Sequence, residues 1–294
     1  MPDEVALAGL KEKRKALDAR LRSVGRLMVA YSGGTDSAYL AYVAHQALGD
    51  EMLAVIADSP SLSRAHLHDA VDFARSQGIP LRVIDTHELE DAEYVRNDST
   101  RCFHCKDELF KVMAQAGEPL GFSAVAYGMN VDDRGDFRPG QKAATEHNVL
   151  APLAEAGLTK EEIRTLAREA GLRVWDKPAS ACLSSRIAYG LPVTRETLEI
   201  IEKAEEALFA MGFRQFRVRH HGELARIEIA REELARMLSL SMFAEASAAL
   251  KRLGYKYVTL DLEGYRSGSM NELLPISQIG LSDARSARTS DGAQ

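Results

Sequence analysis

Ser32–Ser37, which reads SGGTDS, follows a short apolar run at residues 27–31 and precedes a helical pattern at residues 38–48. Two adjacent glycines let the backbone turn so that its N–H groups converge on one point, and the following helix adds the positive end of its dipole. A plain strand-to-helix turn is the simplest alternative, but the hydroxyl and carboxylate side chains favour an anion site. A Walker A loop would carry a Lys directly after its glycines, and none stands there.

Around this loop, strands and helices alternate along the chain. Residues 52–57, 81–84 and 124–127 read as further buried strands, and residues 5–24, 63–77 and 103–114 read as helices. The alternation predicts an α/β fold with a parallel, doubly wound sheet covered on both faces. Ligands of such sheets bind at the carboxyl ends of the strands, where Ser32–Ser37 and the segments after residues 57 and 127 lie.

The pattern changes at Tyr189–Pro192, a Gly/Pro boundary. A helix at residues 194–210 capped by Thr194, two alternating strands at 213–220 and 224–229, helical residues 231–253 and a strand at 257–262 indicate a smaller α+β domain. We therefore predict a first domain over residues 1–188, a second over 189–282, and a small polar tail over 283–294.

Composition limits the classes of function. The 294 residues carry a net charge of −6, with 46% hydrophobic and 27% charged residues, which is typical of a globular protein and gives no global attraction to nucleic acid. No apolar run approaches the ~20 residues that span a bilayer, and Met1–Glu4 is acidic rather than a basic signal-peptide start. We expect a cytoplasmic protein without membrane or nucleic-acid partners.

Three cysteines occur, Cys102, Cys105 and Cys182. The first two follow the helix-capping cluster Asn97–Thr100, so both thiols are expected at a helix N-terminus, where the dipole and Arg101 favour thiolates. A structural zinc site and a redox pair are alternatives, and an isolated Cys such as Cys182 is usually a small buried hydrophobe. Together the three could bind an iron–sulfur cluster that leaves one iron open to exogenous sulfide.

The SGGxDS pattern resembles the PP-loop of the ATP pyrophosphatase superfamily, which cradles the leaving pyrophosphate. The resemblance implies ATP, with Asp36 near a Mg²⁺ ion. It also implies nucleotide contacts after the second and fourth strands, although a turn with a helix entry is an equally simple interpretation of Asp58–Pro60. The implied nucleotide-binding residues are Ser32, Gly33, Gly34, Asp36, Ser37, Asp58, Ser59, Gly128 and Asn130.

The chain as a whole resembles the LarE family, ATP-dependent sulfur transferases that make the nickel-pincer cofactor of lactate racemase. The resemblance is carried by residues 32–37, 102–106, 127–140, 178–186 and 217–228. It implies that each carboxylate of pyridinium-3,5-dicarboxylic acid mononucleotide is adenylated, with release of pyrophosphate, and is then converted to a thiocarboxylate with release of AMP. It also implies a homo-oligomer, with a hexamer expected.

The resemblance bears on the sulfur source as well. Some members have only the counterpart of Cys182 and sacrifice its sulfur, leaving dehydroalanine. This chain departs from that form because it also has Cys102 and Cys105. The three-cysteine form implies that these residues are catalytic together with Asp36, and that they hold a [4Fe-4S] cluster. The cluster would bind sulfide from a sulfide donor and pass it on.

Substrate recognition is predicted in the second domain. Arg217 and Arg219 are alternate residues of one strand, so both guanidinium groups lie on one face and suit a phosphate or carboxylate. A solvated strand face is the alternative, and Glu223 and Glu228 are either partners of these arginines or surface charges. The resemblance adds Ser185 and Arg186 as substrate-binding residues.

Three other functions remain open at this point. A PP-loop tRNA thiolase can combine the loop with a cysteine-held cluster, but it would carry a basic RNA-binding region, and residues 193–262 show charges of both signs. A non-enzymatic nucleotide-binding regulator would not need three thiols. An amidating ligase of the NAD synthetase or GMP synthetase type shares the loop without needing the cysteines.

Overall fold

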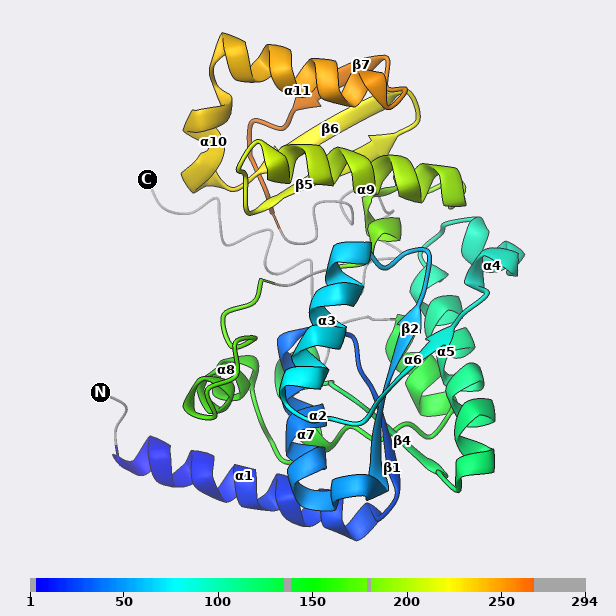
Figure 1. Cartoon of the computed structure of the whole chain (residues 1–294), viewed down its shortest axis with the longest axis vertical. Coiled ribbons are helices and arrows are strands. Elements are labelled where there is room, and N and C mark those ends of the chain that lie inside the picture. Colours follow the sequence, from blue (N-terminus) through cyan, green and yellow to red (C-terminus); the bar gives the residue numbers. More distant parts are fainter. Residues whose placement is uncertain (1–3, 135–138, 179–180, 267–294) are drawn as a thin grey trace. The chain divides into compact units, whose positions relative to one another are not determined.

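The computed structural model describes residues 4–134, 139–178 and 181–266 (Figure 1). The chain forms two compact units. The first takes the described residues of Met1–Ser59, Arg64–His87 and Phe103–Ser180, and the second takes those of Pro60–Ser63, Glu88–Cys102 and Ala181–Gln294. The second unit therefore includes two segments from early in the chain, and the domain boundary after residue 188 stays a prediction.

The first unit contains a four-stranded sheet in the order β3-β2-β1-β4. Its strands are β1 (Leu27–Ala30), β2 (Met52–Asp58), β3 (Leu81–Asp85) and β4 (Ala124–Tyr127), and all pairs are parallel. The predicted parallel α/β sheet is confirmed. Because β1 has β2 on one side and β4 on the other, the strand order reverses at the carboxyl end of β1, where Ser32–Ser37 begins.

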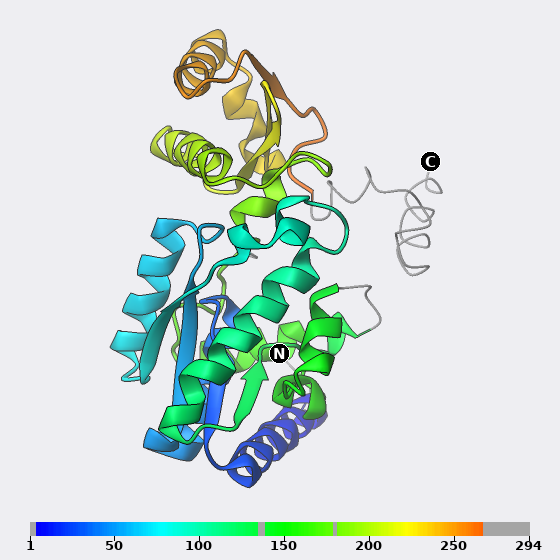
Figure 2. The ribbon, with the colours of Figure 1, turned by 90° about the vertical axis from the view of Figure 1, so that its right-hand side faces the viewer.

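Helices flank this sheet. They are α1 (Glu4–Val24), α2 (Thr35–Leu48), α3 (Arg64–Ser76), α5 (Arg101–Gly117), α6 (Pro139–Glu146), α7 (Pro152–Glu155) and α8 (Lys160–Glu169), with 3₁₀ turns η1 (Gly49–Glu51), η3 (Glu118–Leu120) and η4 (Val131–Asp133). Met28 and Val55 of the strands pack with Phe110 and Met113 of α5 in one core. Figure 2 shows α3 and α5 on opposite faces of the sheet.

The second unit is built on a mixed sheet in the order β5-β6-β7. Strand β5 (Phe216–His221) pairs antiparallel with β6 (Leu224–Ile229), which pairs parallel with β7 (Tyr257–Leu260). The other elements are η2 (Glu88–Glu90), α4 (Ala92–Val95), η5 (Leu183–Arg186), α9 (Arg195–Ala210), α10 (Arg231–Met237) and α11 (Leu240–Arg252). The predicted small α+β region is confirmed, and Thr194 caps α9 by accepting from the Thr197 amide.

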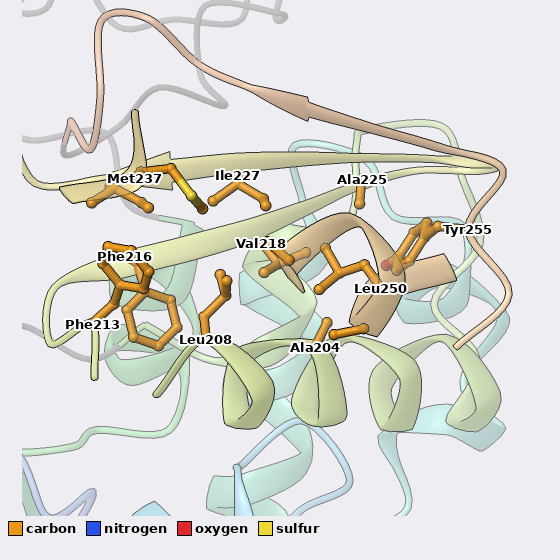
Figure 3. Close-up of a cluster of buried hydrophobic side chains, with 13 residues drawn as sticks. Ala204, Leu208, Phe213, Phe216, Val218, Ala225, Ile227, Met237, Leu250 and Tyr255 are labelled. Atoms are coloured by element: carbon orange, nitrogen blue, oxygen red, sulfur yellow. The ribbon is translucent and has the colours of Figure 1, made fainter. Parts of the chain in front are cut away.

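One face of this sheet forms a closed apolar core. Leu208 of α9 and Leu250 of α11 pack with Phe216 and Val218 of β5, as Figure 3 shows. Side chains alternate along a strand, so Arg217 and Arg219 belong to the opposite face. The apolar core thereby fixes the direction in which the two arginines project.

Several element boundaries differ from those expected, including the ends of α5 and β7, and the helical residues 231–253 form two helices, α10 and α11. Helix α2 begins at Thr35 rather than at residue 38, because the polar residues that suggest a loop also occupy a first helical turn. Strand β5 begins at Phe216, and Phe213 reaches the core from the turn before it. Residues 136–138 of the 127–140 stretch that carries the family resemblance, and the predicted tail at 283–294, lie outside the described residues. Over the residues that the structure describes, no helix is long and apolar enough to cross a membrane.

Candidate active site

The loop between β1 and α2 has a shape that requires glycine at one position. Gly33 has φ +72°, and a Cβ there would lie 2.5 Å from the Cβ of Ala70 on α3. Gly34 is extended and precedes the first turn of α2. Ser37 closes the loop, because its Oγ accepts from the Ser32 amide at 3.1 Å and lies 3.0 Å from the Ser32 Oγ. The first N–H groups of a helix have no carbonyl partner within it, so the start of α2 has the arrangement that suits phosphate oxygens.

The back of the loop is held by side chains through its carbonyl oxygens. Lys177 Nζ donates to the Gly33 carbonyl at 3.1 Å and pairs with Asp69 at 2.5 Å. The Nε2 of His66 lies 2.7 Å from the Ser32 carbonyl. Sequence reasoning missed Lys177 and His66. Both residues are distant from the loop in the chain, and only the folding of α3 and of the segment around residue 177 places their side chains against the loop carbonyls.

Asp36 lies in the first turn of α2 with an incompletely satisfied carboxylate. Its Oδ2 accepts from Asn130 Nδ2 at 3.5 Å, while its Oδ1 is buried and has no hydrogen-bond partner among the described residues. Burial raises the pKa of Asp36, opposed by the charge of Lys160 and reinforced by that of Asp133. A buried carboxylate oxygen with an open lone pair is a suitable ligand for Mg²⁺.

The turn after β4 reaches the same place. A Cβ on Gly128 would lie 2.7 Å from the Ser37 amide nitrogen, so only glycine allows this approach. Asn130 is buried and caps η4, accepting from the Asp132 amide while its own amide nitrogen donates to Asp133. The structure therefore brings together the residues predicted in the loop and after β4.

Asp58 and Ser59 are arranged differently. Asp58 forms an ion pair with Arg64 at the start of α3, and Arg64 also donates to the Ser59 carbonyl at 2.9 Å. These contacts match the turn and helix entry that the sequence also allowed. A nucleotide contact for Asp58 and Ser59 stays a prediction.

The cysteines lie at the start of α5 and before η5. Cys102 is exposed in the first turn of α5, Cys105 lies one turn further along, and Cys182 precedes η5 and is partly buried. Burial alone would lower the pKa of Arg101, but the charges of Cys182 and Cys102 raise it above its ordinary value. Within the described ranges, no three His, Cys, Asp or Glu side chains form a group that could hold a metal ion.

The predicted substrate arginines have protein partners. Arg186 is buried and makes a bidentate ion pair with Glu205 at 3.0 and 3.2 Å. It also donates to the Cys182 carbonyl. Arg219 is buried and donates to Glu228 at 2.7 Å and to the Ser185 carbonyl at 3.1 Å.

Arg217 differs from its two neighbours in its contacts. It donates to the Phe216 carbonyl and stacks over Tyr265, while burial and the charge of Arg186 lower its pKa. Of the two predicted carboxylates, Glu228 is a buried partner, whereas Glu223 forms a surface pair with Lys256.

Comparisons with known proteins agree with this geometry. The model of the NAD synthase family matches residues 12–112, which include the phosphate loop and the first two cysteines. An uncharacterized protein of Synechocystis sp. is 40% identical over 265 residues, covering 90% of this chain and 99% of that protein. One of Methanocaldococcus jannaschii is 30% identical over 242 residues, covering 82% of this chain and 91% of that protein.

The pyridinium-3,5-bisthiocarboxylic acid mononucleotide synthase of Lactiplantibacillus plantarum is 34% identical over 274 residues, which cover 93% of this chain and 99% of that protein. A match of this identity over nearly the full length of both chains includes both units, so it is more than a shared nucleotide-binding sheet. The chain therefore belongs to the LarE family of pyridinium-3,5-bisthiocarboxylic acid mononucleotide synthases and is an ATP-dependent enzyme.

Proposed function

We propose that this enzyme is a sulfur transferase that converts the carboxylates of pyridinium-3,5-dicarboxylic acid mononucleotide to thiocarboxylates in nickel-pincer cofactor biosynthesis. The full-length match to a pyridinium-3,5-bisthiocarboxylic acid mononucleotide synthase supports this choice of substrate. The observation that carries the ATP-dependent step is the phosphate loop with Asp36, whose buried Oδ1 has no hydrogen-bond partner in the described part of the chain.

The first step is adenylation. A substrate carboxylate oxygen attacks the α-phosphorus of ATP, a new P–O bond forms, and the bond to pyrophosphate breaks. Residues Ser32–Ser37 hold the departing pyrophosphate through their amides, and Asp36 would ligate Mg²⁺ beside the charge of Asp133. The ion would supply positive charge to the phosphate oxygens.

The second step is sulfur transfer. A sulfur nucleophile attacks the acyl carbon of the adenylate, AMP leaves, and a thiocarboxylate remains, once for each carboxylate. The protein's part is to present sulfur at Cys102, Cys105 and Cys182. Three thiolates are a suitable donor set for a [4Fe-4S] cluster with one iron open to sulfide from an external donor. The described residues do not form a ready-made metal group, so the donor set rather than the geometry supports this ligation.

We propose that the substrate is recognised at the face of the β5-β6-β7 sheet that carries Arg217 and Arg219. Arg217 lies on this face with its guanidinium stacked over Tyr265 and close to the positive charge of Arg186, and we propose that this concentration of positive charge receives the substrate phosphate. Arg186 and Arg219 position the Cys182 and Ser185 carbonyls and add positive charge near Arg217. We expect a cytoplasmic homo-oligomer, with a hexamer as the proposed state.

The function is tested with protein purified without oxygen and given ATP, Mg²⁺, sulfide and the pyridinium mononucleotide. We expect pyrophosphate, AMP and a product whose mass shows oxygen replaced by sulfur. Pyrophosphate released only with tRNA would instead support a tRNA thiolase, and nucleotide binding without pyrophosphate would support a regulator.

The sulfur source is tested by iron content. With a cluster, the protein should contain about four irons per chain and lose them when any one of the three cysteines becomes Ala. An iron-free, active protein in which only Cys182→Ala is inactive, and in which Cys182 becomes lighter by one H₂S, would show sacrifice of the cysteine instead.

A further inference from the structure

Four polar side chains of the second unit are buried together without facing solvent. Tyr94, Asn97, Arg101 and Ser184 are 1%, 0%, 5% and 0% exposed. Burying a guanidinium is costly unless its donors are satisfied, and an apolar side chain would fill the same space at lower cost. A role for the charge and the hydrogen bonds is therefore expected.

The network joins the start of α5 to η5. Arg101 Nη1 donates to Asn97 Oδ1 at 2.5 Å and to the Ser184 carbonyl at 2.8 Å. The Tyr94 hydroxyl lies 2.6 Å from the Ser184 Oγ. Each contact connects residues 94–101 to one another or to Ser184. Buried hydrogen bonds therefore join residues 94–101 to the η5 segment.

Further bonds extend the connection along the chain. Asn97 Nδ2 donates to the Ala188 carbonyl at 3.0 Å and to the Leu191 carbonyl at 2.8 Å. Asn97 has φ +57°, a left-handed conformation that Asn tolerates better than most residues. The Val193 amide donates to the Val95 carbonyl at 2.9 Å. The segments that carry Cys102 and Cys182 are thus fixed to each other over several residues.

Arg101 joins the two stretches of backbone that carry these thiols. It directly precedes Cys102, and the carbonyl that it binds is two residues after Cys182. The ring of Tyr189, which follows Cys182 in the same segment, lies 5.9 Å from the Arg101 guanidinium. One buried guanidinium therefore connects the backbone beside Cys102 to the backbone beside Cys182.

We propose that Arg101 is a positioning residue that holds Cys102 and Cys182 as a pair, through its buried bonds to Asn97 and Ser184. The use of this pair in sulfur transfer rests on the proposed function. The pairing itself is a property of the protein without ATP, substrate or metal.

The test measures the distance between the thiols rather than activity. Metal-free, reduced Cys105→Ser protein is treated with dibromobimane, which becomes fluorescent when it bridges two nearby thiols, and separately with monobromobimane, which alkylates single thiols. The ratio of the two rates reports geometry, because thiolate content affects both. Arg101→Met should lower this ratio by about tenfold, the scale of losing charge-assisted hydrogen bonds.

Two further variants separate positioning from general damage. Arg96→Met removes an exposed arginine that pairs with Glu93 and Asp98, and it should leave the ratio unchanged. Tyr94→Phe keeps the ring and removes the hydroxyl together with its contact to Ser184, and it should lower the ratio by about threefold with a native circular dichroism spectrum.

The outcomes are separable from those of the functional test. A folded Arg101→Met protein that bridges at the native ratio would overturn the proposal, and if that variant does not fold, an unchanged ratio in Tyr94→Phe would do so. A lowered ratio in an enzyme that fails to transfer sulfur would retain the pairing and reject only the proposed function.

Discussion

Lys177 donates a hydrogen bond to the carbonyl oxygen of Gly33 across 3.1 Å, although 144 positions separate the two residues in the chain. The same ammonium pairs with Asp69, which also pairs with Arg173 at 3.2 Å. Because Lys177 holds this carbonyl on the back of the loop, the loop amides are left to face a phosphate group. The phosphate loop thus depends on a residue near the end of the first unit.

Replacing Lys177 tests this dependence. Lys177→Met should lower ATP-dependent pyrophosphate release by about tenfold or more, because the loop loses a charge-assisted hydrogen bond that fixes its shape. Arg173→Met is the matched control, since Arg173 contacts the same Asp69 and its carbonyl. Equal rates of pyrophosphate release in the two variants would show that Lys177 does not support the catalytic shape of the loop.

The two glycines of the loop should respond differently to Ala. Gly33→Ala places a Cβ 2.5 Å from Ala70 and forces a non-glycine residue to φ +72°, a strain of about 1–3 kcal/mol before the clash is counted. The Cβ of Gly34→Ala meets only the Ser32 Oγ, at 3.5 Å. Thermal unfolding should show a lower midpoint for Gly33→Ala than for Gly34→Ala, and identical midpoints would contradict the loop geometry.

Asp36→Asn should lose pyrophosphate release yet gain stability at neutral pH. Burial raises the pKa of Asp36 in the folded state, so the native protein binds its proton more tightly than the unfolded chain does. The ionised carboxylate therefore costs stability above the folded pKa, and this cost disappears below the ordinary carboxyl pKa. The difference in unfolding midpoint between Asp36→Asn and the native protein should shrink as pH falls through that window.

This stability difference also reports on the metal. Mg²⁺ should raise the unfolding midpoint of the native protein, because it binds the folded carboxylate and relieves its charge. The same addition should change Asp36→Asn much less. A native protein that is indifferent to Mg²⁺ with and without ATP would argue against Asp36 as a ligand.

Substitutions of Arg219 and Arg217 should have different effects, the first on the stability of the fold and the second on substrate recognition. Arg219→Met removes an ion-pair partner of the fully buried Glu228, which also pairs with Arg226, and breaking such a buried pair costs about 3 kcal/mol in unfolding free energy. Arg217→Met removes the cation that we propose receives the substrate phosphate, and it should mainly weaken the response to the pyridinium mononucleotide. Chemical denaturation and substrate titration of both variants measure the two effects, and an unchanged unfolding free energy for Arg219→Met would refute this division.

Local patterns along the chain predicted much of the fold. The apolar runs at 52–57 and 124–127 coincide closely with β2 and β4, because a buried parallel strand needs a short continuous apolar stretch. Thr194 identified the start of α9, since an N-cap hydroxyl satisfies amides only a few residues away. The start of α2 was placed late because Thr35, Asp36 and Ser37 look alike in a loop and in a first helical turn.

The sequence by itself determined the phosphate loop, the parallel sheet and the family. Each of these follows from residues close together in the chain, such as the complete SGGTDS motif at residues 32–37. Only the tertiary structure decided that Lys177 supports Gly33, that Asn130 meets Asp36, and that Arg101 and Ser184 connect the two cysteine segments. It also showed that Arg186 and Arg219 pair with carboxylates. The physical reason is that a charged side chain reaches any partner that packing brings within a few ångströms, and the spacing of residues along the chain does not specify that packing.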